Sequence, residues 1–253
     1  MFNPVRWFFS INKKCFRAIA KIFPNTKFSI DECYREQVKK YLADGCTVLD
    51  VGGGRKWQFQ DERKNFTGLH VIALDPSEAQ LSYNHDADEK ILFAMGTNEC
   101  APLDDNSVDL VTSRMVLEHI PNNDFTMREI SRILKPGGTF ISVMPSKFAL
   151  FAMINQTMPN WLARKVLFFF MPETKDSCGF KAYYDRTYYP AMNKLLTRYG
   201  FSRTEFAFSY SQSGYFGFFV PFAVISLLWD FLMYVFGVKP LSAYLCFTAH
   251  KEN

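Results

Sequence analysis

Residues 47–54 read TVLDVGGG, and this stretch decides the fold. A short apolar run carries a carboxylate, Asp50, and is followed directly by three glycines. This pattern predicts a buried strand that turns sharply at its end, because glycine tolerates backbone angles that other residues avoid and lets the chain approach a ligand closely. A tight strand-to-helix connection without any ligand has the same pattern, so the surrounding segments have to decide between the two.

Outward from this stretch, short apolar runs alternate with helical patterns. Near 125–134 the apolar residues fall on one helix face, and Pro136, Gly137 and Gly138 are expected to stop that helix. Strands that alternate with helices form parallel units with right-handed crossovers. The strands expected besides 47–51 are 71–74, 91–94, 108–113, 139–144, 201–208 and 241–248, with a further helix near 192–198.

A second carboxylate, Asp75, ends the next expected strand, 25 residues after Asp50. A carboxylate at this place can accept hydrogen bonds from both hydroxyls of a ribose that is bound over the first glycine turn. The two features together indicate a nucleoside-containing cofactor. An NAD-binding fingerprint would need a glycine at the sixth position counted from Gly52, where this chain has Trp57. An NAD or nucleotide enzyme therefore stays only as an alternative.

Five consecutive pieces of the sequence carry a family resemblance. They are VLDVGGG at 48–54, ALD at 73–75, PLDDNSVDLV at 102–111, SRMVLEHI at 113–120 and REISRILKPGG at 128–138. In this order they resemble the class I S-adenosylmethionine-dependent methyltransferases, in the branch with quinone-pathway and many uncharacterised bacterial enzymes. The resemblance implies an α/β, doubly wound, mostly parallel seven-stranded sheet, a Rossmann-like methyltransferase fold, here with hydrophobic helical insertions. Its sixth and seventh strands would form the antiparallel edge.

The resemblance also implies a cofactor site. Asp50, Gly52, Gly53 and Gly54 would cradle the methionine end of S-adenosylmethionine, and Asp75 would hold its ribose. Ser113 and Arg114 would border the methyl group. The assignments for the adenine are Thr97 and Asn98, which stand where many relatives have an aspartate.

A second departure from the family pattern lies in the glycine turn. Lys56 replaces the usual third glycine, and Arg55 or Lys56 is then expected to meet the cofactor carboxylate. Together with Thr97, Lys56 keeps an alternative open: a non-catalytic protein that binds the cofactor with the same fold.

The catalytic candidates are His119, Arg114 and Tyr184. A histidine is the commonest general base, although adjacent Glu118 and His119 can equally be part of the framework. Tyr184 lies after the fifth expected strand. It is expected either to cover the substrate or to lie at the start of a surface helix. Methyl transfer from a sulfonium depends mainly on positioning and desolvation, so no catalytic triad is required. No metal site is expected, because the four histidines and six cysteines show no ligand spacing.

Charge is distributed unevenly along the chain. Residues 1–27 carry six basic residues and no acid, whereas the remainder is slightly acidic. We interpret 1–30 as a basic amphipathic helix with Phe8, Ile11, Cys15, Ile19 and Ile22 on its apolar face, and 31–253 as the methyltransferase domain. The helix either docks on the domain or lies in an anionic lipid interface. The body has no basic stripe, so no nucleic-acid partner is expected.

Two insertions, at about 147–190 and 215–238, are rich in aromatic residues, which make up 17% of the chain. The second contains a single charge, Asp230, and both of its ends return to one sheet, so it should lie on a membrane face without crossing it. The acceptor is expected to be a small or lipid-like molecule that is methylated on oxygen or carbon. With no secretory signal and no paired cysteines, the location expected is cytoplasmic and peripherally membrane-associated.

Overall fold

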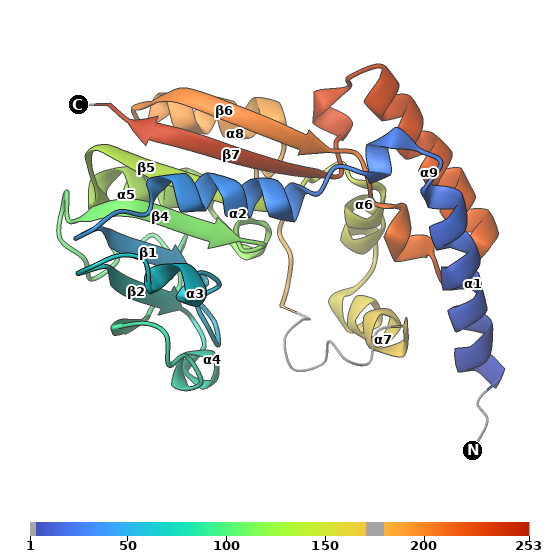
Figure 1. Ribbon diagram of the computed structural model, residues 1–253, viewed down its shortest axis with the longest axis horizontal. Helices are drawn as coiled ribbons and strands as arrows, with labels where there is room; N and C mark the ends of the chain where they lie inside the picture. The colour runs from blue at the N-terminus through green and yellow to red at the C-terminus, as the bar shows by residue number, and fades with distance from the viewer. Residues whose placement is uncertain (1–3, 171–179, 253) are drawn as a thin grey trace.

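The structure is a computed structural model that describes residues 4–170 and 180–252. Met171, at the end of the Phe-rich run, and Cys178 lie outside the described residues. A twisted sheet with helices on both faces forms one part of the molecule, and a group of apolar helices lies beyond one edge of that sheet (Figure 1).

The sheet has seven strands in the order β3-β2-β1-β4-β5-β7-β6. The first five strands run parallel, and β7 is antiparallel to both β5 and β6. The predicted seven-stranded, mostly parallel sheet with an antiparallel edge is therefore confirmed. The bounds of the seven strands are β1 Thr47–Val51, β2 His70–Asp75, β3 Glu89–Leu92, β4 Val108–Arg114, β5 Leu134–Pro145, β6 Phe201–Ser209 and β7 Tyr244–Lys251.

The two faces of the sheet carry separate apolar clusters, because successive side chains of a strand point to opposite faces. In β1, Val48 belongs to the cluster beneath α2 (Ile30–Tyr41), whereas Leu49 belongs to the cluster beneath α5 (Asn123–Ile133) and α8 (Tyr189–Arg198). The short helices α3 (Gln60–Arg63) and α4 (Glu78–Ser82) complete the β1–β3 half. Single 3-10 turns lie at Pro24–Thr26, Leu117–His119, Ser213–Phe216 and Lys239–Leu241.

Three expected strands are displaced in the structure. Strand β3 lies two residues before 91–94, and β7 starts three residues after 241 because Pro240 lies in a 3-10 turn. Strand β5 starts at Leu134, so the Pro136–Gly138 stretch does not separate the helix from the strand as expected. The pairing of β4 with β5 shifts its register at this stretch, so the proline and glycines form an irregularity within the strand.

Four helices lie beyond the carboxyl edge of the parallel strands: α1 (Pro4–Ala20), α6 (Leu150–Thr157), α7 (Asn160–Phe170) and α9 (Val220–Val235) (Figure 1). Helix α1 runs alongside α9, and Phe16 packs against Ala223 and Leu227. The rings of Phe9 and Phe169 bring α7 into contact with α1. In the parts of the chain that the structure describes, every helix is too short or too polar to cross a bilayer.

Candidate functional site

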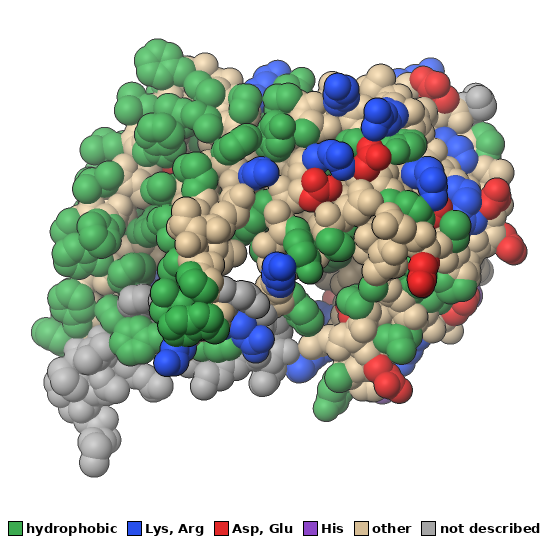
Figure 2. All heavy atoms as spheres, turned by 180° about the vertical axis from the view of Figure 1, so that it is seen from behind, with side chains coloured by type: hydrophobic (Ala, Val, Ile, Leu, Met, Phe, Trp, Pro, Cys, Tyr) green, Lys and Arg blue, Asp and Glu red, His purple; other side chains and the backbone are tan. Residues whose placement is uncertain are grey.

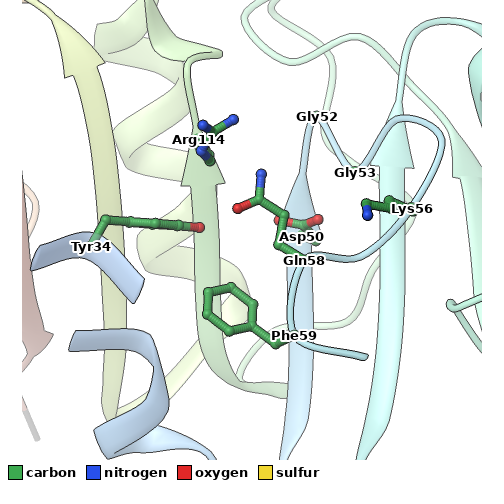
Figure 3. Close-up of a pocket in the computed structure, with 8 residues that line it drawn as sticks. All are labelled: Tyr34, Asp50, Gly52, Gly53, Lys56, Gln58, Phe59 and Arg114. Atoms are coloured by element: carbon green, nitrogen blue, oxygen red, sulfur yellow. The ribbon is translucent and has the colours of Figure 1, made fainter. Parts of the chain in front are cut away.

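A polar pocket lies at the carboxyl ends of β1 and β4, where the order of the strands reverses direction along the sheet (Figure 3). Ligands of open α/β sheets bind in the crevice at such a switch point. Strand β1 and the turn after it supply an acid and glycines, β4 supplies a cation, and α2 supplies a phenol. The lining residues are Tyr34, Asp50, Gly52, Gly53, Lys56, Gln58, Phe59 and Arg114.

The glycine turn is fixed by packing as well as by backbone angle. Gly52 has φ +74°, and a Cβ at this residue would lie 2.2 Å from a methyl group of Val116. A Cβ on Gly53 would lie 2.9 Å from that of Ala73 on β2. The N–H groups of both glycines donate to the carbonyl of Leu74, at 2.7 and 3.2 Å. The turn therefore needs glycine at both positions, whatever it binds.

Asp50 is the acid of the pocket. Its carboxylate accepts a hydrogen bond of 2.7 Å from the hydroxyl of Thr112 on β4. The pKa of Asp50 is raised to about 7, mainly by burial and to a smaller extent by the nearby charge of Asp75, while the hydrogen bond from Thr112 opposes the rise. A cationic group in the pocket would therefore gain a partner that becomes fully charged on contact.

Asp75 stands at the end of β2 and holds the turn together. It accepts hydrogen bonds from Gly54 N–H at 3.2 Å and from Ser77 N–H at 2.8 Å. Burial raises its pKa, and these two bonds oppose that rise. Each carboxylate oxygen retains a further lone pair that can accept a hydroxyl group.

Two cations line the pocket on either side of Asp50, Arg114 on β4 and Lys56 in the loop after β1 (Figure 3). Arg114 Nε donates to Asp31 at 2.6 Å, and Gln58, in the amide orientation that suits both of its ends, accepts from Arg114 at 3.2 and 3.3 Å. Lys56 lines the same pocket. An acid and two cations within one pocket can hold a zwitterion such as an α-amino acid.

The adenine candidates lie apart from this pocket. Thr97 and Asn98 are exposed and are absent from its lining residues. Thr97 donates its hydroxyl to the carbonyl of Ala94 at 3.0 Å, and Asn98 accepts from the amide of Asn122 at 3.0 Å. Ser113 is buried at the end of β4, and its hydroxyl has no hydrogen-bond partner among the described residues.

The candidates His119 and Tyr184 meet at a second place, around Glu118. The carbonyl of Glu118 accepts the N–H groups of Tyr183 and Tyr184 at 2.8 and 3.0 Å. Its carboxyl group is buried, with Oε2 unpartnered in the described part of the chain, and burial raises the pKa of Glu118 to about 8. The hydroxyl of Tyr184 lies 3.5 Å from Asn155, and burial raises the pKa of Tyr184 to about 12.

His119 adopts one tautomer in this arrangement. Its Nδ1 lies 3.0 Å from the carbonyl of Lys181, which can only accept, so Nδ1 carries the proton. Nε2 lies 3.9 Å from the carboxyl group of Glu118, and burial lowers the pKa of His119. The imidazole is therefore neutral near pH 7, with a basic nitrogen on the side of Glu118.

Three lining residues were missed by the sequence analysis: Tyr34, Gln58 and Phe59. Tyr34 lies on α2 and reaches the pocket over the face of the sheet that α2 covers. The centres of the Tyr34 and Phe59 rings are 6.1 Å apart. In the sequence, Tyr34 and Phe59 look like ordinary core residues of a helix and a loop, and Gln58 looks like an ordinary polar loop residue. Within 4–170 and 180–252, there is no group of three or more potential metal ligands among His, Cys, Asp and Glu.

Comparison with known proteins identifies the central part of the chain. Residues 49–142 match the family model described as a methyltransferase domain. Among curated relatives, the sterol 24-C-methyltransferase of Schizosaccharomyces pombe is 33% identical over 133 residues, 47% of this chain and 35% of that protein. The ubiquinone/menaquinone biosynthesis C-methyltransferase of Hahella chejuensis is 29% identical over 132 residues, 48% of this chain and 49% of that protein. The chain thus spans less than half the length of these two relatives.

A solved structure with the same fold is the phosphoethanolamine N-methyltransferase 2 of Haemonchus contortus, in complex with S-adenosyl-L-methionine. It aligns with a TM-score of 0.55 and 17% sequence identity, over 88% of this chain and 53% of that one. The similarity extends across the sheet and beyond the segment that the family model matches.

Proposed function

We propose that this chain, whose residues 49–142 match the methyltransferase domain family, binds S-adenosylmethionine in the pocket at the ends of β1 and β4 and transfers its methyl group to a lipophilic acceptor. The observation that carries the proposal is the placement of Asp50, Arg114 and the glycine turn in one pocket at the switch point of the sheet.

The donor set of the pocket fits this cofactor. The Asp50 carboxylate suits the α-ammonium group of the methionine moiety, and Arg114 or Lys56 suits its carboxylate. Asp75 follows on the neighbouring strand and suits the ribose hydroxyls. When bound, the cofactor supplies a methyl group that is attached to a positively charged sulfonium sulfur. The transfer is favourable because the sulfur leaves as a neutral thioether. The residues of this chain then have to position the acceptor and exclude water.

The acceptor side is proposed to be the group around Glu118, His119 and Tyr184. Glu118 and His119 follow β4 directly, and Tyr184 N–H donates to the carbonyl of Glu118, so the group borders the same edge of the sheet as Ser113 and Arg114. The neutral His119 presents Nε2 as a base, which suits removal of a proton from a hydroxyl group or from an acidic carbon. We therefore propose methylation of oxygen or carbon.

Attachment to a membrane surface, on its cytoplasmic side, completes the proposal. The four helices are rich in exposed apolar side chains. They lie beyond the carboxyl edge of the parallel strands (Figure 1), which is also the edge where the residues of the pocket lie. A lipophilic acceptor held in a bilayer would reach the site from this side. The protein would attach peripherally, without crossing the bilayer.

Calorimetry and a transfer assay test these statements separately. We expect the protein to bind S-adenosylmethionine and S-adenosylhomocysteine, and not NAD. It should also transfer labelled methyl groups from S-adenosylmethionine into a membrane lipid extract. Binding of NAD alone would favour the nucleotide-enzyme alternative. Binding of S-adenosylmethionine without transfer to any lipid fraction would favour the non-catalytic alternative.

A further inference from the structure

Helix α9 has its only charge on the inside and its apolar side chains on the outside. Asp230 is 1% exposed, whereas Ile225 is 64% and Leu232 is 48% exposed. The side facing the protein consists of Ala223, Ser226, Leu227 and Asp230. This distribution is the reverse of a helix on the surface of a water-soluble domain, whose polar side faces outward. Helices in contact with lipid have this arrangement, with ionisable groups turned toward the protein.

Asp230 is held in place from within. Its carboxylate accepts hydrogen bonds from Gln212 N–H and Ser213 N–H, at 2.9 and 3.0 Å, and from the Gln212 side-chain amide at 2.9 Å. These three bonds fix the rotation of α9 about its own axis. The apolar outer side is therefore built into the fold, since turning it inward would strip a buried carboxylate of its donors.

Helix α1 adds cations beside an apolar side. Phe16 packs against α9, and the Asn12 side chain accepts a hydrogen bond of 3.0 Å from Val220 N–H. This docking leaves Trp7 and Ile11 exposed on one flank. The other flank carries exposed Lys13, Lys14 and Arg17, exposed Lys21 follows the last residue of the helix, and the helix contains no acid.

The aromatic residues favour the same surface. Of the four tryptophans of the chain, Trp7, Trp161 and Trp229 are exposed on α1, α7 and α9, and only Trp57 lies in the core. Tryptophan is enriched where protein meets the headgroup layer of a membrane. Seen from behind, hydrophobic side chains gather at the end of the molecule that these helices form, whereas most of the charged side chains in view lie over the rest of the surface (Figure 2).

We infer that the outer sides of α1 and α9 form a docking face that inserts into the headgroup layer of an anionic bilayer. This inference rests on the proposed attachment to membranes and assigns it to particular residues and to one class of lipid. The docking face is defined by Trp7, Ile11, Phe222, Ile225, Trp229 and Leu232. Apolar insertion together with basic residues gives the two contributions that stable peripheral attachment needs.

Charge complementarity favours a bilayer over a second copy of this chain as the partner of the docking face. A copy that packed through the same face would bring no exposed carboxylate to the lysines of α1, because α1 has no acid and the only acid of α9 is buried. Anionic phospholipid headgroups supply that charge. Pairing two copies would instead bring two basic flanks together.

Flotation of the full chain on a density gradient tests the docking face. The probes are vesicles of phosphatidylcholine alone and vesicles of phosphatidylcholine mixed with phosphatidylglycerol. We expect the protein to float with the mixed vesicles, and added salt to reduce the floating fraction. Ile225→Ser with Leu232→Ser should lower the vesicle-bound fraction about tenfold, and Lys13→Glu with Lys14→Glu should remove the preference for anionic lipid.

Matched controls use exposed residues at the far edge of the sheet. Tyr83→Ser with Leu92→Ser removes two exposed apolar side chains, and Lys64→Glu with Lys90→Glu reverses two exposed charges. Both control variants should float like the unaltered chain.

Two results would overturn the inference. One is protein that stays at the bottom with both kinds of vesicle. The other is a dimer, seen by light scattering, that Ile225→Ser with Leu232→Ser converts to a monomer without any flotation. Binding of S-adenosylmethionine, measured by calorimetry on the same variants, should be unchanged in every case. A failure of the docking face is thereby distinguished from a failure of the proposed cofactor site.

Discussion

Arg114 Nε donates a hydrogen bond of 2.6 Å to Asp31 Oδ1 and thereby joins the carboxyl end of β4 to the first turn of α2. Arg114 also lines the pocket with Tyr34, which lies one turn further along α2. The ion pair thus closes one side of the proposed cofactor site, and its two partners have different roles there.

We expect this ion pair to matter little for stability and Arg114 to matter for binding. The Arg114 and Asp31 side chains are 38% and 42% exposed, so water screens their attraction. A double-mutant cycle with Asp31→Ala and Arg114→Ala, followed by urea unfolding, should give a coupling below about 1 kcal/mol. Affinity for S-adenosylmethionine should fall in Arg114→Ala and stay nearly unchanged in Asp31→Ala. Equal losses in the two variants would remove Arg114 as the carboxylate partner.

Asp75→Ala should weaken binding of S-adenosylmethionine by about tenfold or more, because two hydrogen bonds to a charged acceptor are lost. The variant also loses the bonds to Gly54 and Ser77 N–H, so its melting temperature has to be measured alongside the calorimetry. Asp75→Asn, which keeps the shape and one acceptor oxygen, serves as the control. Unchanged affinity in a folded Asp75→Ala protein would remove the ribose assignment.

Gly52→Ala should destabilise the fold through two separable effects. The residue has φ +74°, which costs an alanine about 1–2 kcal/mol, and its Cβ would overlap Val116. Gly45→Ala isolates the first effect, since Gly45 has φ +69° with nothing within 4 Å of its Cβ. We expect a larger loss for Gly52→Ala than for Gly45→Ala in urea unfolding, and partial recovery when Val116→Ala is added. Equal losses at the two glycines would contradict the packing constraint.

Binding of S-adenosylmethionine should release a proton from Asp50. The pKa of this carboxyl is raised to about 7, so it is partly protonated near neutral pH, and a bound ammonium group favours the ionised form. Affinity should therefore rise as the pH increases from about 6 to about 7. Calorimetry at one pH in phosphate and in imidazole buffers, which differ in ionisation enthalpy, measures the proton directly. The two buffers should give different enthalpies for the unaltered chain and the same enthalpy for Asp50→Asn.

Glu118→Gln should stabilise the protein at alkaline pH. The folded-state pKa is raised to about 8, above the ordinary value, so the contribution of the protonated carboxyl is fully present below about pH 4.5 and is lost as the pH rises through about 8. Glutamine keeps the shape without the charge. Urea unfolding should give similar stabilities for the two proteins near pH 5 and a more stable variant near pH 9. Replacement of the exposed Glu99 by glutamine serves as the control, and this variant should be as stable as the unaltered chain at both pH values.

The parts of the site that follow from strand ends could be predicted from the sequence. Asp50 and Arg114 are 64 residues apart, but β1 and β4 are neighbours whose carboxyl ends lie side by side, and both residues line one pocket. The same reasoning could not find Tyr34 or Gln58. They line the pocket because a helix and a loop pack beside the strand ends, and no local sequence pattern predicts that packing. Nor could it place Tyr184 beside Glu118, because the loop turns at a left-handed residue, Tyr184 itself, with φ +51°.

The amphipathic helix at the N-terminus was predicted, but its orientation was not. On the predicted apolar side, Phe8, Ile11, Cys15 and Ile22 are exposed and only Ile19 packs near α9. The centre of that contact is Phe16, which lies outside the predicted side. The position of α9, 200 residues later in the chain, sets this rotation. Periodicity identifies the apolar side of a helix, whereas its rotation against a neighbour depends on contacts that only the folded chain reveals.

The position of β7 between β5 and β6 has a consequence for the order of folding. Thr139 on β5 and His250 on β7 meet at 3.1 Å, although 111 residues separate them in the chain. During synthesis on the ribosome, β5 therefore emerges long before β7. Until then β5 is an unpaired edge strand whose residues are mostly buried in the folded protein, and such an edge can pair with strands of other chains. Strand β6 is synthesised in the same interval, so β5 and β6 both keep an unpaired edge until β7 emerges and pairs with each of them.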